Sequence, residues 1–155
     1  MSHPNAETLD KFYRAFQAKD GDAMASVYAS DATFSDPVFP GLEGDEVGGM
    51  WRMLCKRGKD LVVEYAVLSA DYTAGEARWE AWYTFGATGR KVHNTVRSSF
   101  TFRDGKVVAQ VDDFDLYAWT RMALGPVGLL LGWSPIVQNK VRRTARSGLK
   151  AFLAK

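Results

Sequence analysis

After Gly58 the sequence alternates between apolar and polar residues over four long runs, and this alternation restricts the chain to folds built on an antiparallel sheet. The runs cover about residues 60–71, 76–88, 91–103 and 106–117. Short turns separate them, and the last turn, Asp104-Gly105, is a strong signal for a tight hairpin. Because so few residues join each run to the next, we predict a meander of four antiparallel strands.

Each predicted strand has one apolar face and one polar face, so one side of the sheet must be covered. In the third run the mainly apolar face consists of Val92, Asn94, Val96, Ser98, Phe100 and Phe102. The opposite face carries His93, Thr95 and Arg97. We therefore assign the first face to the core and the second to solvent or an interface.

Three helical patterns precede the strands. The first spans about residues 5–19 and the second is a short helix capped by Asp22. The third runs from Val47 to Cys55. A short strand from Ala32 to Pro37 separates the second pattern from the third. Three helices leaning on a curved antiparallel sheet predict an α+β cone, in a single domain over residues 1–155 with a further C-terminal helix.

Positive charge is concentrated near the C-terminus. The chain has 20 Lys and Arg against 18 Asp and Glu, yet Ser134 to Lys155 contains six basic and no acidic residues. The rest of the chain is therefore net acidic, and we expect no nucleic-acid partner. The single cysteine, Cys55, excludes an intrachain disulfide or a cysteine-based zinc site. With only two distant histidines we expect no metal and no cofactor, and without a secretory or membrane-spanning segment we predict a cytoplasmic protein.

The order of elements resembles the nuclear transport factor 2-like superfamily, in its SnoaL-like and ketosteroid isomerase-like branch. The resemblance is carried by Tyr13 in the first helix and by the segment Asp31-Ala-Thr-Phe-Ser-Asp36-Pro37 one helix later. It covers residues 5 to about 117. It implies a cone that encloses an apolar pocket for a small molecule.

This resemblance implies a general base at Asp36 and, at Tyr13, a hydroxyl that stabilises an enolate. The family's second donor, a protonated aspartate, corresponds to Ser98, and a serine hydroxyl is a weaker donor. Asp112, on the next strand, supplies a carboxylate. The alternation after Gly105 puts it on one face with Gln110, and the resemblance implies that this face points inward. SnoaL-like cyclases use a similar late-strand acid, so either Asp36 or Asp112 is the candidate catalytic acid or base. Two carboxylates in one apolar cavity predict a raised pKa.

Other inward positions are expected to line the pocket. Neutral polar contacts come from Asn94, Ser98 and Gln110. An aromatic wall consists of Trp51, Trp79, Tyr83, Phe85, Phe100 and Phe114. The residues also have structural interpretations, since an aspartate before proline is common in turns and a tyrosine on an apolar helix face is often core. We therefore predict a protein that binds a small hydrophobic, carbonyl-bearing molecule, either as an isomerase or cyclase or as a non-enzymatic ligand-binding or dimerisation module.

The outer sheet face is less charged than a solvated face usually is, which predicts a homodimer. Its neutral positions are Trp82, Thr84, His93, Thr95 and Thr101.

Residues 118–155 form an extension beyond the family core. We expect Leu124 to Trp133 to close the mouth of the cone as a lid and a helix from about Pro135 to Phe152 to pack on the body. An interfacial membrane helix is the alternative, but the narrow apolar stripe of this helix favours packing over membrane contact.

Overall fold

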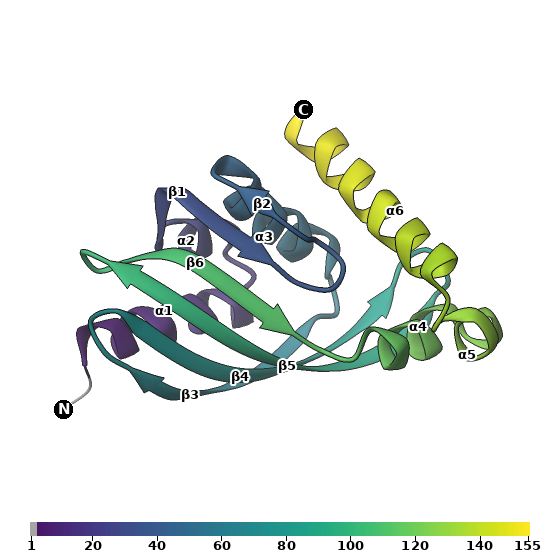
Figure 1. Cartoon of the computed structure of the whole chain (residues 1–155), viewed down its shortest axis with the longest axis horizontal. Coiled ribbons are helices and arrows are strands. Elements are labelled where there is room, and N and C mark those ends of the chain that lie inside the picture. Colours follow the sequence, from purple (N-terminus) through teal and green to yellow (C-terminus); the bar gives the residue numbers. More distant parts are fainter. Residues whose placement is uncertain (1–2) are drawn as a thin grey trace.

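A long curved sheet with helices against one face dominates the computed structural model, which describes residues 3–155 (Figure 1). The strands are β1 (Tyr28–Ser35), β2 (Leu42–Glu43), β3 (Val62–Ala70), β4 (Ala74–Phe85), β5 (Arg90–Arg103) and β6 (Lys106–Asp113). Their order across the sheet is β2-β1-β6-β5-β4-β3. The predicted meander is therefore confirmed as β3 to β6. β1 lies at the β6 edge of this meander and pairs with β6 in parallel.

Three N-terminal helices cover the inner face, as predicted. They are α1 (Pro4–Gln17), α2 (Gly21–Ala25) and α3 (Asp45–Arg57). α1 lies along β3 and buries the stripe Leu9, Phe12, Tyr13 and Phe16. The predicted cap of α2 was wrong, because Asp20 accepts the hydrogen bond from the Ala23 N–H while Asp22 pairs with Arg52.

The alternation in β5 is confirmed, since its predicted inner residues are buried and the residues between them are exposed. β6 departs from the prediction at one point. A register shift against β5, between Thr101 and Phe102, places Val107 in the core at 0% exposure and leaves Val108 half-buried. The extra residue of this bulge restores the predicted phase, so Gln110 and Asp112 still face inward.

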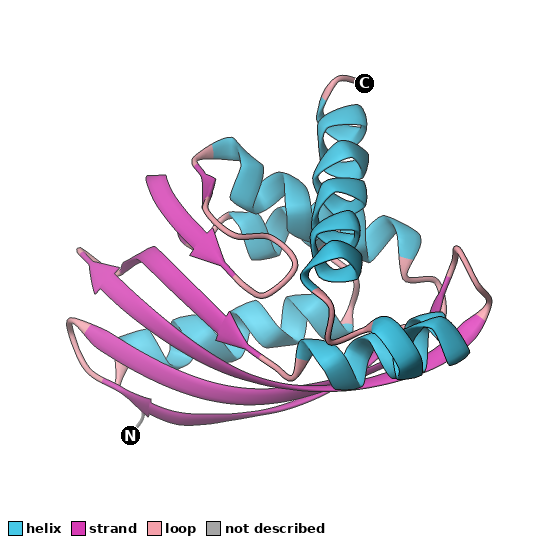
Figure 2. Cartoon of the chain, turned by 45° about the vertical axis from the view of Figure 1, so that its right-hand side comes forward, coloured by secondary structure: helices cyan, strands magenta, loops and turns pink. Residues whose placement is uncertain are grey.

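The C-terminal extension contains three helices where one was predicted. They are α4 (Leu116–Leu124), α5 (Pro126–Leu131) and α6 (Pro135–Leu153). The last strand ends at Asp113, and the Asp115 carboxylate then caps α4 by accepting a hydrogen bond from the Ala118 N–H. α4 packs on β5, and α6 rises away from the sheet beside α3 (Figure 2). No described helix is long and apolar enough to cross a membrane.

The expected lid over Leu124 to Trp133 was wrong. α5 lies on α4 and keeps its large apolar side chains exposed, so it closes no opening. The expected packing of the last helix is confirmed by Leu149, which is fully buried in the main core. α6 also spans the loop after β1, where the Arg142 and Arg146 guanidinium groups donate hydrogen bonds to the carbonyls of Pro37 and Pro40.

Candidate active site

Asp112 carries a carboxyl group into the middle of the sheet's inner face. It lies near the end of β6, directly opposite Ser98 on β5, and is 3% exposed. An unpaired carboxylate at such depth costs several kcal/mol. The surrounding polar groups therefore decide whether this side chain holds its charge.

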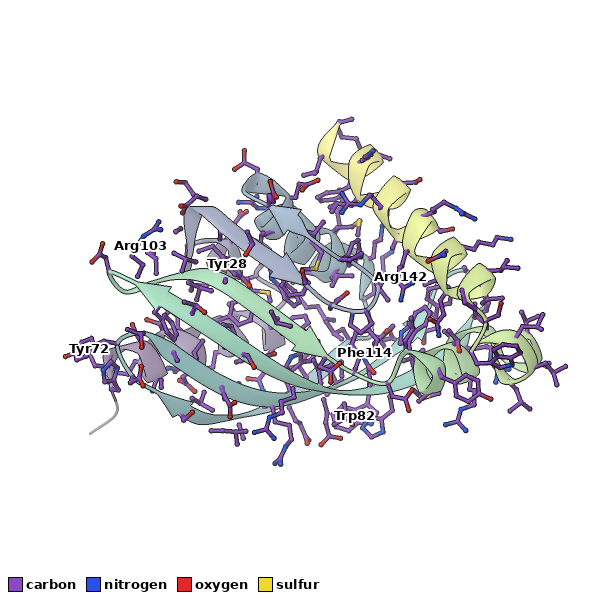
Figure 3. All side chains as sticks on the ribbon, viewed as in Figure 1. Tyr28, Tyr72, Trp82, Arg103, Phe114 and Arg142 are labelled. Carbon is purple, nitrogen blue, oxygen red and sulfur yellow. The ribbon has the colours of Figure 1, made fainter. Side chains whose placement is uncertain are left out.

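A chain of hydrogen bonds approaches the carboxyl group from the β1 side. The Gln110 amide donates from Nε2 to Asp112 Oδ1 at 2.9 Å, and its Oε1 accepts a hydrogen bond from the Tyr28 hydroxyl. The Trp51 indole donates to that hydroxyl at 2.8 Å. Figure 3 shows Tyr28 between the sheet and the helices. Gln110 is thereby fixed in one orientation, with its N–H group on the Asp112 side.

The other side of the carboxyl group faces β5 and β4. The Trp79 indole donates from Nε1 to Ser98 Oγ at 2.9 Å, which leaves the serine hydroxyl proton free to point at Asp112. This arrangement explains a buried serine in a mainly apolar strand face. The predicted aromatic wall residues Trp51 and Trp79 therefore also contribute indole N–H groups to the polar network.

Burial raises the pKa of Asp112 to about 7. Hydrogen bonds from Ser98 and Gln110 oppose this rise, and the nearby Asp36 carboxylate adds to it. The raised pKa predicted for a carboxyl group in this cavity is thus supported by its surroundings. At neutral pH such a group exists in both protonation states, as an exchangeable acid or base must.

Tyr13 lies on the helical side of the same site. Its ring stacks on Tyr65 at 5.1 Å between centroids and meets Phe100 edge-on at 6.4 Å. Burial raises the pKa of its hydroxyl well above the usual value, and Asp112 raises it further. Within residues 3–155 this buried hydroxyl has no hydrogen-bond partner in acceptable geometry, although Ser98 lies close to it. Tyr13 is therefore neutral, and its hydroxyl can donate a hydrogen bond that no described residue accepts.

Asp36 has different surroundings and lies directly after the end of β1. Its Oδ1 accepts hydrogen bonds from the backbone N–H groups of Val38 at 2.7 Å and Phe39 at 2.6 Å. Burial raises its pKa, while these two backbone bonds oppose the rise. The side chain thus closes the turn after β1 and acts on Asp112 through its charge.

The structure gathers Tyr13, Ser98, Gln110 and Asp112 in one place and leaves other predicted residues farther along the sheet. Phe100 and the nearly buried Asn94 lie on the inner face of β5. Tyr83, Phe85 and Phe114 are half-buried and pack on a smaller cluster around Trp119 of α4. Figure 3 shows Phe114 on the inner side of the sheet and Trp82 on the outer side.

Two residues that hold predicted site residues in place were missed in the sequence. Tyr28 begins β1, and its hydroxyl donates a hydrogen bond to Gln110. Trp119 lies in α4 and donates from its indole to the Tyr83 hydroxyl at 2.7 Å. No local pattern indicates either contact, because both join elements that are distant in the chain.

The interior around Asp112 is filled by aromatic side chains. Two surface hollows lie elsewhere, one of about 370 Å³ beside Trp82 and His93 and one of about 320 Å³ beside Arg52 and Phe152. A ligand that reaches Asp112 must pass the buried side chains around it. Within the described chain no three His, Cys, Asp or Glu side chains are grouped to hold a metal ion.

The curved, unclosed sheet with a helical layer on one face has the fold of the NTF2-like α+β cones. Within this class the chain belongs to the SnoaL-like domain family, whose model matches residues 9–110. Asp112 and the helices α4 to α6 lie just beyond the matched residues. No curated protein matches the chain.

Several solved structures share the fold. An NTF2-like protein of unknown function from Burkholderia pseudomallei K96243 has a TM-score of 0.68 and 18% identity, covering 78% of this chain and 98% of its own. A candidate polyketide cyclase from Silicibacter sp. TM1040 has a TM-score of 0.68 and 18% identity, with coverages of 77% and 94%. An LEH-like epoxide hydrolase from M. tuberculosis has a TM-score of 0.60 and 21% identity, with coverages of 86% and 95%. These similarities establish the fold.

Proposed function

We propose that the protein binds a small hydrophobic carbonyl compound and moves a proton at the carbon beside the carbonyl, with Asp112 as the acid and base. One observation carries this proposal: a buried carboxyl group with a pKa of about 7 lies beside a neutral tyrosine hydroxyl that has no partner within the described chain. The polyketide cyclase and epoxide hydrolase names of the structural neighbours support a small, largely apolar substrate.

The reaction needs only groups that the chain contains. Ionised Asp112 takes a proton from the carbon, and the electron pair of that C–H bond moves into the carbonyl group to form an enolate. The Tyr13 hydroxyl donates a hydrogen bond to the enolate oxygen. The enolate then recovers a proton from Asp112 at a different carbon, which gives an isomer. Alternatively it attacks a second carbonyl carbon, whose oxygen becomes an alkoxide and takes the proton from Asp112, which gives a ring. Proton and electron count balance in both outcomes.

Asp112 is a better candidate for this role than Asp36. Two backbone N–H groups already donate to Asp36 Oδ1, and these bonds fix the orientation of its carboxylate in the turn. Asp36 still matters, because its negative charge helps to raise the pKa of Asp112. We therefore assign Asp36 a positioning and electrostatic role.

Substrate entry is proposed on the α4 side of the cone. There Asp36 lies near Tyr83, and Tyr83 is tied to α4 by the Trp119 indole. The surrounding Val38 and Phe114 side chains are only half-buried, unlike the tightly buried residues around Trp51. This side therefore has the fewest packing contacts to break.

The test compares the wild type with Asp112→Asn and Asp36→Asn on 3-oxosteroids and polyketide-like ketones. Deuterium uptake at the carbon beside the carbonyl is followed by NMR, and product by absorbance. We expect Asp112→Asn to abolish both signals and Asp36→Asn to lower them partly. Asp113→Asn is the matched control, since Asp113 is the exposed neighbour on the same strand. Turnover that survives at the wild-type rate in both site variants contradicts the assignment.

A non-enzymatic ligand-binding protein is the second candidate, favoured by the filled interior and by the hydrogen bonds that Asp112 already receives. On this alternative the same compounds bind without deuterium uptake. Calorimetry on Asp112→Asn distinguishes the enzyme from the binding protein. A protein that only binds keeps its ligand affinity in this variant, and neither the wild type nor the variant exchanges deuterium into the ligand.

We also propose that the outer faces of β4 and β5 pair two copies of the chain. Trp82 stacks on His93 there at 4.6 Å between ring centroids, and Glu80 holds the His93 ring at 2.6 Å. An aromatic pair of this kind suits an interface better than a surface of unpaired charges. Sedimentation should show a dimer at micromolar concentration that Trp82→Glu dissociates, and a wild-type monomer contradicts the proposal.

A further inference from the structure

An apolar cluster projects from the corner formed by α5 and the start of α6. Its most exposed members are Ile136 at 80%, Leu130 at 69% and Trp133 at 67%. Val127, Leu129 and Leu131 are also exposed. In Figure 1 this corner is the right-hand end of the molecule, beyond every strand. Large apolar side chains gathered at one extremity mark a contact surface more often than chance.

The exposure of this corner is fixed by its packing. α5 rests on α4 through glycine, and a Cβ atom added to Gly128 would lie 1.9 Å from the Thr120 carbonyl oxygen. A Cβ atom on Gly132 would lie 2.1 Å from Thr120 Oγ1. The Tyr117 hydroxyl also donates to the Leu129 carbonyl at 2.7 Å. Because the small side of α5 is held against α4, its leucines must point into solvent.

Basic residues flank the apolar cluster and no acidic residue follows α4's cap. Residues 116–155 contain seven Lys and Arg and no Asp or Glu. Lys140 and Arg143 lie four and seven positions after Ile136, so they share its face of α6, and both are exposed. Neither forms an ion pair within the described chain, whereas Arg146 reaches Glu46.

We propose that this corner docks on an anionic membrane surface. Leu130, Trp133 and Ile136 would enter the boundary between headgroups and acyl chains, and Lys140 and Arg143 would face the headgroup phosphates. Exposed Leu and Trp beside Lys and Arg is the composition of interfacial membrane contacts. A second copy fits less well, because a symmetric pairing would bring the positive charges of the two chains together.

The experiment uses the full chain with vesicles of phosphatidylcholine alone or mixed with phosphatidylglycerol. We expect cosedimentation with the mixed vesicles only, weakening as NaCl is raised. Lys140→Gln with Arg143→Gln should lower the partition coefficient about thirtyfold at low ionic strength. Leu130→Gln with Trp133→Gln should lower it at least as much. All four positions are exposed, and unchanged thermal melting shows that each variant folds.

Two matched controls separate this surface from general stickiness. Leu68→Gln removes an exposed apolar side chain on β3, and Lys11→Gln with Lys59→Gln removes two positive charges elsewhere. Both should bind vesicles like the wild type. Absence of binding to anionic vesicles, or binding that survives the Leu130 and Trp133 changes, overturns the proposal. A dimer in solution that Leu130→Gln dissociates also overturns it, by identifying a second copy as the occupant.

Discussion

The middle of the sheet and the α5 corner depart from the usual burial pattern in opposite directions. The first encloses an ionisable carboxyl group, Asp112, and the second holds large apolar side chains such as Leu130 in solvent. Both arrangements are unfavourable taken alone. Asp112 lies opposite its cross-strand partner Ser98, and Gly128 of α5 lies against the Thr120 backbone. Regions that keep an unfavourable arrangement in a rigid setting are where we expect function.

Removing α6 tests whether the two regions depend on each other. Deletion of residues 134–155 exposes the core around Leu149 and releases the Arg142 and Arg146 hydrogen bonds. We expect the free energy of unfolding to fall by about 5 kcal/mol. Denaturant unfolding followed by circular dichroism measures this, and truncation after Leu153 is the control. An unchanged unfolding curve would show that the sheet and its acid are independent of the C-terminal helices.

The pH dependence of stability tests the buried carboxyl group directly. Because the pKa of Asp112 is raised to about 7 in the folded state, folding favours its protonated form. The free energy of unfolding therefore falls as the pH rises from the pKa of Asp112 in the unfolded chain toward 7. Above that range the contribution of Asp112 no longer changes with pH. Asp112→Asn removes this dependence, so its stability relative to wild type should grow by about 3 kcal/mol between pH 5 and pH 8. Parallel curves for the two proteins would place the carboxyl group in contact with solvent.

A single methyl group tests the packing that exposes the α5 corner. In Gly128→Ala the new Cβ collides with the Thr120 carbonyl oxygen, so α5 must move away from α4. We expect a loss of about 2 kcal/mol in thermal unfolding. Gly86→Ala is the matched control, because no atom lies within 4 Å of its Cβ position. Equal effects of the two substitutions would mean that α5 is not held by its glycine face.

The smallest expected effect concerns the tyrosine hydroxyls. Tyr13→Phe removes a buried hydroxyl that has no partner among the described residues, so stability should rise by about 1 kcal/mol while activity falls. Tyr28→Phe removes a hydroxyl bonded to Trp51 and Gln110 and should lower stability instead. Opposite signs in chemical denaturation are the expected result. A loss of stability in Tyr13→Phe would assign its hydroxyl a structural bond.

The sequence predicts what depends on local periodicity. The alternation of β5 and the shared face of Gln110 and Asp112 follow from spacing, while the family resemblance turns that face inward, and both side chains are buried. The bulge at Val107 was not predictable, because one extra residue preserves the composition of the strand while shifting its phase. The exposure of α5 was also missed, because the sequence does not show that Gly128 lies against the Thr120 carbonyl. Contacts between distant elements, such as Tyr28 with Gln110, leave no periodic signal at all.

The parallel pairing of β1 with β6 has a consequence for how the protein folds. Tyr28 and Gln110 are 82 positions apart in the chain, so their hydrogen bond closes a very long loop. The hairpins β3–β4, β4–β5 and β5–β6 need only short loops and can form earlier. β6 must therefore form before β1 can dock on it. During synthesis β1 can pair only after almost the whole sheet has left the ribosome. Asp112, at the seam between the two, is enclosed in the last step, which makes docking of β1 the expected rate-limiting event.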